Sequence, residues 1–256
     1  MVSEFWLILV IVTVSGFMME VVDAAIGMGY GTILAPILLM AGFDPLQVIP
    51  AVLISQLIGG LLTSFFHHKF KNVNFAIGGE HLRAAIVLGV LSAAGAVASV
   101  LVAISLSKFY LSLYIGLLAT ILGLVVLATR NRKYNFSWPK MIFIGLLAAF
   151  NKGLSGGGYG PIVTAGQIMS GVVEKSAVSI TSLSEVLVSL TAVFTYILAR
   201  GSVDWVLTSC LVISVSFSAP VAAFIVRRTE SGKLKVLIGV ATFLLGLATI
   251  LKATLS

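Results

Sequence analysis

The residues that could do chemistry in this chain lie in and around two glycine-rich stretches. The first stretch and the residue before it supply Asp23, Gly27, Gly29, Tyr30 and Gly31, and the second supplies Lys152, Ser155, Gly156, Gly157, Gly158, Tyr159 and Gly160. Free backbone amides beside a lysine and hydroxyl groups favour an anion. Glu185, which lies inside an apolar run, is a candidate proton carrier. The residue types therefore predict anion binding, and no nucleophile and base pair predicts catalysis.

The two stretches are copies of one pattern, 129 residues apart. A gapless alignment places Gly27 on Gly156 and Tyr30 on Tyr159, and it also places Asp23 on Lys152 and Gln56 on Glu185. Self-similarity at a fixed offset indicates an internal duplication. We expect one transmembrane transport domain over 1–256, with a first repeat over 5–129 and a second over 139–252.

Composition predicts an all-α integral membrane protein. Apolar residues make up 59% of the chain, charged residues 10%, and the mean hydropathy is +1.13. A soluble domain carries about 25% charged residues. About eight apolar helical segments are expected, two of them broken by glycines, over 5–22, 46–66, 84–106, 109–129, 139–170, 176–198, 204–226 and 234–251. The first is expected to be retained as a helix and not cleaved as a signal peptide.

The net charge of +7 lies in short connections, which is an orientation signal and does not indicate a nucleic-acid partner. If each broken segment crossed the membrane once, positive residues would divide nine to six between the two sides. If each doubles back as a hairpin, twelve fall on one side, and only Lys108, Arg200 and Lys252 fall on the other. The second model predicts two inverted-topology repeats in the cell (plasma or inner) membrane, with the Lys/Arg-rich loops cytoplasmic.

Local signals agree with a hairpin. Asp44, Pro45 and Gln47 follow Gly42 in the order of a capping box that opens a helix. Half-helices are expected to start after Gly31 and after Gly160, and each would direct amide groups and a positive dipole end toward an anion. Brought together by the pseudo-symmetry, the two ends would form one site near the midplane, to which Tyr30, Tyr159 and Ser155 add hydroxyl donors.

The sequence leaves the roles of the buried charges open. Asp23 and Lys152 either pair with each other or bind the ligand, and Glu185 either carries a proton or is a neutral hydrogen-bonded acid. Asp23 and Gln56 are the other candidates for proton coupling. His67 and His68 adjoin Lys69 at a helix end and are expected at the interface, not as metal ligands, because adjacent helical positions point apart. No metal and no cofactor is expected.

The duplicated glycine-rich breaks, each followed by an apolar half-helix, a turn at Gly42 or Gly171 and a helix that bears Ser55 or Ser184, resemble the TauE/SafE sulfite exporter family of anion permeases. By resemblance, the six residues that match the repeated glycine pattern are Gly27, Gly29, Gly31, Gly156, Gly158 and Gly160. The resemblance implies export or uptake of sulfite, sulfonates or other small sulfur-containing anions, driven by a proton or ion gradient.

A secondary-active transporter working by alternating access in the lipid bilayer is thus the first hypothesis, and an anion channel is the alternative. A cation channel is a remote third, because Gly29, Tyr30 and Gly31 echo a potassium filter, but two unequal loops beside Lys152 suit a cation poorly. The sequence does not determine which anion is carried, in which direction, with which ion, or whether the chain forms a homodimer.

Overall fold

The structure is a computed structural model that describes residues 2–27, 29–129, 138–169, 172, 174–226 and 232–255. All regular secondary structure in these ranges is helical, which confirms the expected all-α class. The described helices are α1 (Val2–Ile26), α2 (Tyr30–Met40), α3 (Pro45–Lys69), α4 (Glu80–Ser105), α5 (Lys108–Thr129), α6 (Trp138–Ser155), α7 (Tyr159–Met169), α8 (Glu174–Arg200), α9 (Trp205–Val226) and α10 (Gly232–Leu255).

Five of the described helices are long and apolar enough to cross a membrane: Pro45–Lys69, Glu80–Ser105, Lys108–Val125, Lys175–Arg200 and Trp205–Ile225. Shorter apolar helices cover Tyr30–Met40 and Thr242–Leu255. These lengths fit an integral membrane protein, since about 20 residues of helix span the hydrocarbon. The number of eight crossing segments stays a prediction.

Helix boundaries repeat at the offset that the sequence predicts. The half-helices α2 and α7 both have 11 residues, and they begin at Tyr30 and Tyr159. The following helices, α3 and α8, begin at Pro45 and Glu174. Both half-helices begin two residues earlier than expected, because the glycines before Tyr30 and Tyr159 already complete each break. The turn residue Gly171 lies outside the described residues.

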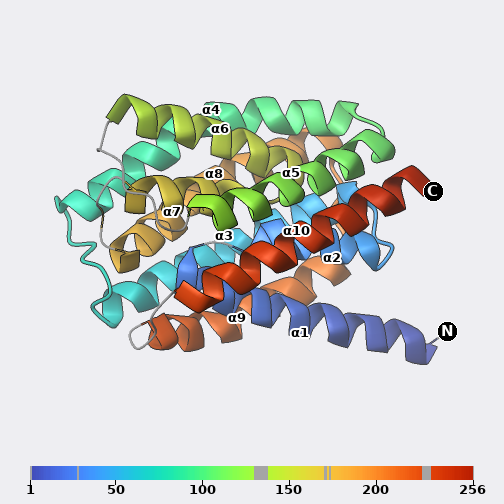
Figure 1. Ribbon diagram of the computed structural model, residues 1–256, viewed down its shortest axis with the longest axis horizontal. Helices are drawn as coiled ribbons and strands as arrows, with labels where there is room; N and C mark the ends of the chain where they lie inside the picture. The colour runs from blue at the N-terminus through green and yellow to red at the C-terminus, as the bar shows by residue number, and fades with distance from the viewer. Residues whose placement is uncertain are drawn as a thin grey trace.

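Helix contacts made by the first half are also made by the corresponding helices of the second half. Helix α4 packs against α6 and α8, and its counterpart α9 packs against α1 and α3. Two counterpart pairs, α3 with α8 and α5 with α10, pack against each other across the middle of the bundle (Figure 1). The core that joins the halves is therefore formed by corresponding helices.

The counterpart helices that touch run antiparallel. The start of α3 meets the end of α8, where Arg200 donates to the carbonyl oxygen of Leu46, whereas Gly60 later in α3 lies against Ser182 early in α8. In the other pair, Gly116 lies against Ile250. Further along α5, Thr120 lies against Gly246, nearer the start of α10.

The first broken segment returns to the side of the bundle on which it began. The start of α1 and the end of α10, marked N and C, lie on the same side in Figure 1. Lys252 near the end of α10 donates to the carbonyl oxygens of Leu39 and Met40 at the end of α2, at 2.8 and 3.1 Å. Helices α1 and α2 therefore form a hairpin.

The expected cap of α3 is confirmed. Asp44 is the N-cap residue, its carboxylate accepts from the N–H of Leu46 at 3.0 Å, and Pro45 occupies the first helical position. The side chain of Gln47 accepts from the N–H of Asp44 at 3.1 Å, which completes the capping box. The turn after α2 is thus set by local chemistry.

Candidate functional site

The two glycine breaks begin with the same backbone conformation. Gly27 and Gly156 have φ angles of +74° and +75°, a left-handed conformation that favours glycine. Their N–H groups donate to the carbonyl oxygens of Asp23 at 2.5 Å and of Lys152 at 2.7 Å. Helices α1 and α6 therefore end in the same way, at corresponding residues.

The structure brings the two breaks into direct backbone contact. A Cβ atom added to Gly31 would collide with the carbonyl oxygen of Gly156, and one added to Gly157 would lie 2.6 Å from the backbone nitrogen of Thr32. The N–H of Gly158 donates to Thr32 Oγ1 at 3.0 Å, and Thr164 Oγ1 donates to the carbonyl oxygen of Gly27 at 3.0 Å. In each break, a buried backbone group thus finds its hydrogen-bond partner on a threonine of the opposite repeat.

The start of α2 is capped by the protein's own carboxylate. The N–H of Tyr30, the first residue of α2, donates to Asp23 Oδ1 at 3.2 Å. The corresponding residue before α7 is Lys152, which has no acceptor atom. Ser155 instead accepts from the N–H of Gly157 at 3.1 Å and donates to the carbonyl oxygen of Asn151 at 2.8 Å. The two half-helices thus start with opposite charges beside them.

Both tyrosines of the breaks point to a serine on the next long helix. Tyr30 Oη and Ser55 Oγ are 2.8 Å apart, and Tyr159 Oη donates to Ser184 Oγ at 3.0 Å. Each serine in turn donates to the carbonyl oxygen three residues earlier, at 2.9 Å. The hydroxyl groups hold α2 against α3 and α7 against α8, and their role as donors to an anion stays a prediction.

Removing either tyrosine hydroxyl should have the same effect on stability. We expect Tyr30→Phe and Tyr159→Phe each to cost about 1 kcal/mol through loss of a buried hydrogen bond, which is about 2–4 °C in Tm for a chain of this size. Thermal unfolding of the purified variants measures both shifts. The exposed Tyr110, replaced with phenylalanine, is the control and should not change Tm. Clearly unequal shifts would contradict the equivalence of the two sites.

Close to the crossing, a lysine, a glutamate and a glutamine from three helices form a buried group of polar side chains. Lys152 of α6 is fully buried, and its Nζ atom lies 2.6 Å from Glu185 Oε1 of α8. The same ammonium donates to Gln56 Oε1 of α3 at 2.7 Å, and Gln56 Nε2 donates to Glu185 Oε1 at 3.2 Å. Gln56 and Glu185, corresponding residues of the two repeats, thus share one lysine.

This arrangement answers a question that the sequence left open. The ion-pair partner of Lys152 is Glu185 and not Asp23, whose carboxylate is used at the start of α2. Glu185 does have a basic neighbour, although its own helix supplies none within a turn. The sequence could not show this, because the neighbour comes from α6 and depends on how α6 packs against α8.

The structure corrects the expectation for His67. It is fully buried, and its Nδ1 atom lies 3.0 Å from Asn72 Nδ2, which also contacts the carbonyl oxygen of Ala223 at 3.0 Å. Because α9 covers this part of α3, His67 is not interfacial, whereas His68 is exposed as expected. Within the described ranges, no group of three or more His, Cys, Asp or Glu side chains could hold a metal ion.

Sequence reasoning missed the two threonines that bridge the breaks. Thr32 and Thr164 each bond to the backbone of the opposite repeat. Their counterparts in the duplication are Pro161 and Ala35, so no repeated pattern marks them. Only the packing of the two breaks identifies these residues.

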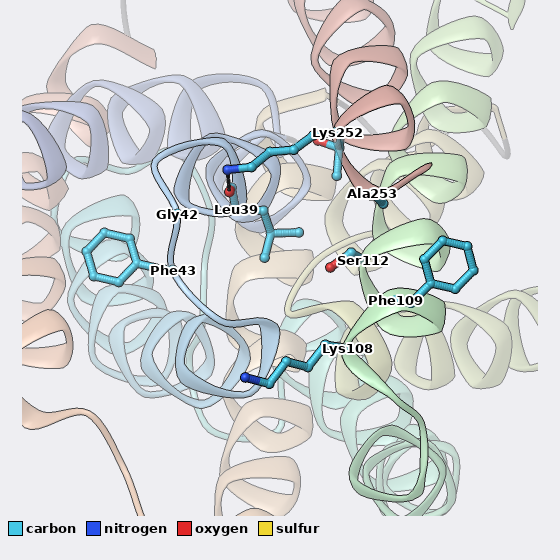
Figure 2. A pocket seen from close by; sticks show the side chains of 9 residues that line it. Leu39, Gly42, Phe43, Lys108, Phe109, Ser112, Lys252 and Ala253 are labelled. Atoms are coloured by element: carbon cyan, nitrogen blue, oxygen red, sulfur yellow. Dashed lines mark hydrogen bonds between the residues drawn. The ribbon is translucent and has the colours of Figure 1, made fainter. Parts of the chain in front are cut away.

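A separate cavity of about 320 Å³ lies at the end of the bundle where α2, α5 and α10 meet. Figure 2 shows the ammonium of Lys252 directed at Leu39 and that of Lys108 on the other side of the opening. The cavity is lined by Leu39, Gly42, Phe43, Lys108, Phe109, Ser112, Thr249, Lys252 and Ala253. Its wall is mainly apolar, with two cations at the rim.

Asp44 ties this end of the bundle together. Its carboxylate pairs with Lys108 of α5, and Gln47 reaches Asp204 before α9 at 3.3 Å. Partial burial acts to raise the pKa of Asp44, but the hydrogen bonds from Lys108 and from the N–H of Leu46 outweigh it and lower the pKa below its ordinary value. The carboxylate and its pairing with Lys108 are therefore fully present at neutral pH.

Comparison with known proteins agrees with these features. The family model of the sulfite exporter TauE/SafE matches residues 12–249. The chain is also 24% identical over 243 residues to the probable membrane transporter protein YtnM of Bacillus subtilis (strain 168), covering 90% of this chain and 79% of that protein. No solved structure matches the chain. With its duplicated glycine breaks and its apolar helices, this chain is a multi-pass membrane protein that belongs to the sulfite exporter TauE/SafE family.

Proposed function

We propose that this protein is a secondary-active transporter of small sulfur-containing anions, such as sulfite or organosulfonates, that moves a proton with the anion by alternating access. The observation that carries the proposal is Lys152, a fully buried ammonium in the last turn of α6, directly before the crossing of the two breaks. An ammonium beside helix N-termini is suited to an oxyanion.

The ion pair suggests how anion and proton are coupled. In this structure Glu185 holds Lys152 at 2.6 Å, so an anion that reaches the lysine competes with that carboxylate. A carboxylate that loses its partner inside a protein is costly, and binding a proton removes the cost. Anion binding at Lys152 and proton binding at Glu185 therefore favour each other, which is the thermodynamic requirement for coupling.

The remaining residues of the proposed site position these two. Glycines at the crossing let the backbones touch, and the amides of α2 and α7 face inward there. The anion-binding set comprises Gly27, Gly29, Tyr30, Gly31, Lys152, Ser155, Gly156, Gly157, Gly158, Tyr159 and Gly160. Gln56 bridges lysine and carboxylate in the resting arrangement, and Asp23 is a second acid beside the start of α2.

The proposal includes inverted-topology repeats. Support comes from counterpart helices that pack antiparallel, α3 against α8 and α5 against α10. A two-fold axis in the membrane plane relates antiparallel counterparts, whereas an axis along the membrane normal relates parallel ones. The rocking of one half against the other would then expose the crossing first to one side and then to the other.

The proposed location is the cell membrane, with the Lys/Arg-rich loops in the cytoplasm. Lys108, Arg200 and Lys252, the three residues expected outside, all contact the stretch from Leu39 to Leu46 at one end of the bundle. The cytoplasmic side would carry Lys69, Lys71, Arg83 and Lys175. The other residues of that set are Arg130, Arg132, Lys133, Arg227 and Arg228, which lie outside the described residues, and Lys140, Lys233 and Lys235, whose side chains also do.

The cavity beside Lys108 and Lys252 would serve as the external vestibule. It lies at the end of the bundle assigned to the outside, and the ammonium of Lys252 at its rim favours the approach of an anion, whereas Asp44 offsets the charge of Lys108. A homodimer is a further part of this proposal.

The test is transport by the purified protein in liposomes. An inward proton gradient should drive sulfite or sulfoacetate to accumulate above its external concentration, with saturation, and sulfate, acetate and taurine serve as comparison solutes. In detergent, an anion at about 100 times its Kd should stabilise the fold by about 2.7 kcal/mol. Passive flux without saturation or accumulation would favour the anion channel, and stabilisation by potassium alone would overturn the anion site.

A further inference from the structure

A line of buried polar side chains runs from the central ion pair toward the loop between α3 and α4. On α3 it follows Gln56, Gly59, Thr63 and His67, whose spacing of three and four residues places them on one helical face. Glu20 of α1 lies beside this face. Apart from the glycine, every member is buried and can donate or accept a hydrogen bond.

Glu20 lies between the polar face of α3 and the buried ion pair of Lys152 and Glu185. It is 3% exposed, and Thr63 Oγ1 donates to its Oε1 atom at 3.0 Å. A Cβ atom added to Gly59 would lie 3.3 Å from the same oxygen, so this glycine makes room for the carboxyl group. Asp23, Glu185 and Lys152 are near enough to Glu20 to interact with it electrostatically, and of the three Asp23 has the largest effect.

His67 connects the line to the surface, one turn beyond Thr63. The amide Nδ2 of Asn72 is a donor, so Nδ1 of His67 accepts and Nε2 carries the hydrogen. Nε2 is near the backbone of Ala24 but makes no hydrogen bond of good geometry with any described residue. Beyond Asn72, Val73 is buried and Asn74 is exposed.

The duplicated half of the protein shows that the scaffold does not need these groups. The residues that correspond to Glu20, Thr63 and His67 are Ala149, Ala192 and Tyr196. Tyr196 Oη donates at 3.3 Å to the carbonyl oxygen of Gly153, which is the counterpart of Ala24. A ring side chain thus occupies this place in both halves, whereas the acid, the hydroxyl and the imidazole occur in the first half only. Ionisable groups at this depth are costly and are retained for function.

We propose that Glu20, Thr63 and His67 form the path by which a proton passes between Glu185 and the face of the membrane that bears the loop between α3 and α4. This inference rests on the proposed function. In the inward direction, a proton from water at the loop binds Nδ1 of His67 in place of the hydrogen bond from Asn72, and Nε2 gives up its own proton toward the Thr63 hydroxyl. That hydroxyl accepts one proton and passes its own to Glu20, which is hydrogen-bonded to it, and the outward direction reverses each transfer. No bond other than O–H and N–H is made or broken.

The experiment compares anion exchange with proton movement in liposomes that contain a pH-sensitive dye. Exchange of labelled for unlabelled sulfite needs no net proton, so Glu20→Gln and His67→Phe should retain it. Proton movement driven by a sulfite gradient should be about 100-fold slower in both, the scale of a lost acid–base group. Tyr196→Phe, the matched change in the other half, should keep both activities.

If Glu20→Gln or His67→Phe does not fold, Thr63→Val replaces it: sulfite exchange should be retained and proton movement should be slowed. Thr63→Ser, which keeps the hydroxyl, should show wild-type proton movement. If Glu20→Gln and His67→Phe exchange sulfite and also move protons at the wild-type rate, the proton path is wrong, but the proposed transport function stands. Sulfite exchange by the wild type without proton movement would refute the path and the coupling but not the anion site. A wild-type protein that moves no sulfur anion would refute the proposed function itself.

Discussion

Lys152→Met is expected to lower the free energy of unfolding by about 3–5 kcal/mol, the cost of leaving a buried charge without its partner. Lys152 holds Glu185 at 2.6 Å and Gln56 at 2.7 Å, and all three side chains are buried. The methionine fills a similar volume but cannot donate a hydrogen bond. Thermal or denaturant unfolding in detergent measures the loss, and sulfite transport should disappear in the same variant.

A double variant separates charge from packing. Glu185→Gln removes the orphaned carboxylate, so Lys152→Met combined with Glu185→Gln should regain most of the lost stability, because replacing a whole buried pair is often neutral. Transport should stay absent in the double variant, since the anion has lost its cation. Recovery of transport together with stability would show that Lys152 has only a structural role.

Gly31→Ala is expected to separate the two breaks and to abolish transport. The added methyl group would overlap the carbonyl oxygen of Gly156, which belongs to the backbone and cannot rotate away. Overpacking of this kind costs about 1–3 kcal/mol or more. Because Lys152 lies in the last turn of α6 directly before the crossing, we expect a larger effect on sulfite transport than on Tm.

Gly201→Ala is the matched control. Gly201 has a φ angle of +70°, and nothing lies within 4 Å of an added Cβ atom, so this change introduces backbone strain without a collision. It should cost about 1 kcal/mol and leave saturable transport in place. If Gly31→Ala transports as well as Gly201→Ala, the crossing of the breaks is not the transport site.

Local chemistry explains why several features were predictable. The capping box at Asp44 and Gln47 needs only residues within one turn, and it is present as expected. The glycines at 27 and 156 interrupt their helices because of their own backbone freedom, so the breaks occur where the pattern places them. The starts of α2 and α7 were predicted two residues late, because the extent of a break depends on where the returning helix is capped.

Other features depended on contacts between distant helices. The Thr32 and Thr164 bridges have no counterpart in the duplication, and His67 is buried only because α9 covers the end of α3. The residues near His67 in the sequence do not reveal that α9, more than 130 residues later, packs against this part of α3. Burial of a polar group at a helix end is therefore decided by tertiary packing.

The sequence by itself determined that this is a membrane protein with duplicated, glycine-broken helices, because hydropathy and repetition are properties of the chain alone. It also singled out Lys152, Gln56 and Glu185, since charged and polar residues are rare in apolar segments. Only the tertiary structure decided that these three meet and that Asp23 caps α2 instead. The physical reason is that an ion pair forms between side chains that the folded backbone brings within hydrogen-bond distance, and that proximity arises from the packing of α3, α6 and α8.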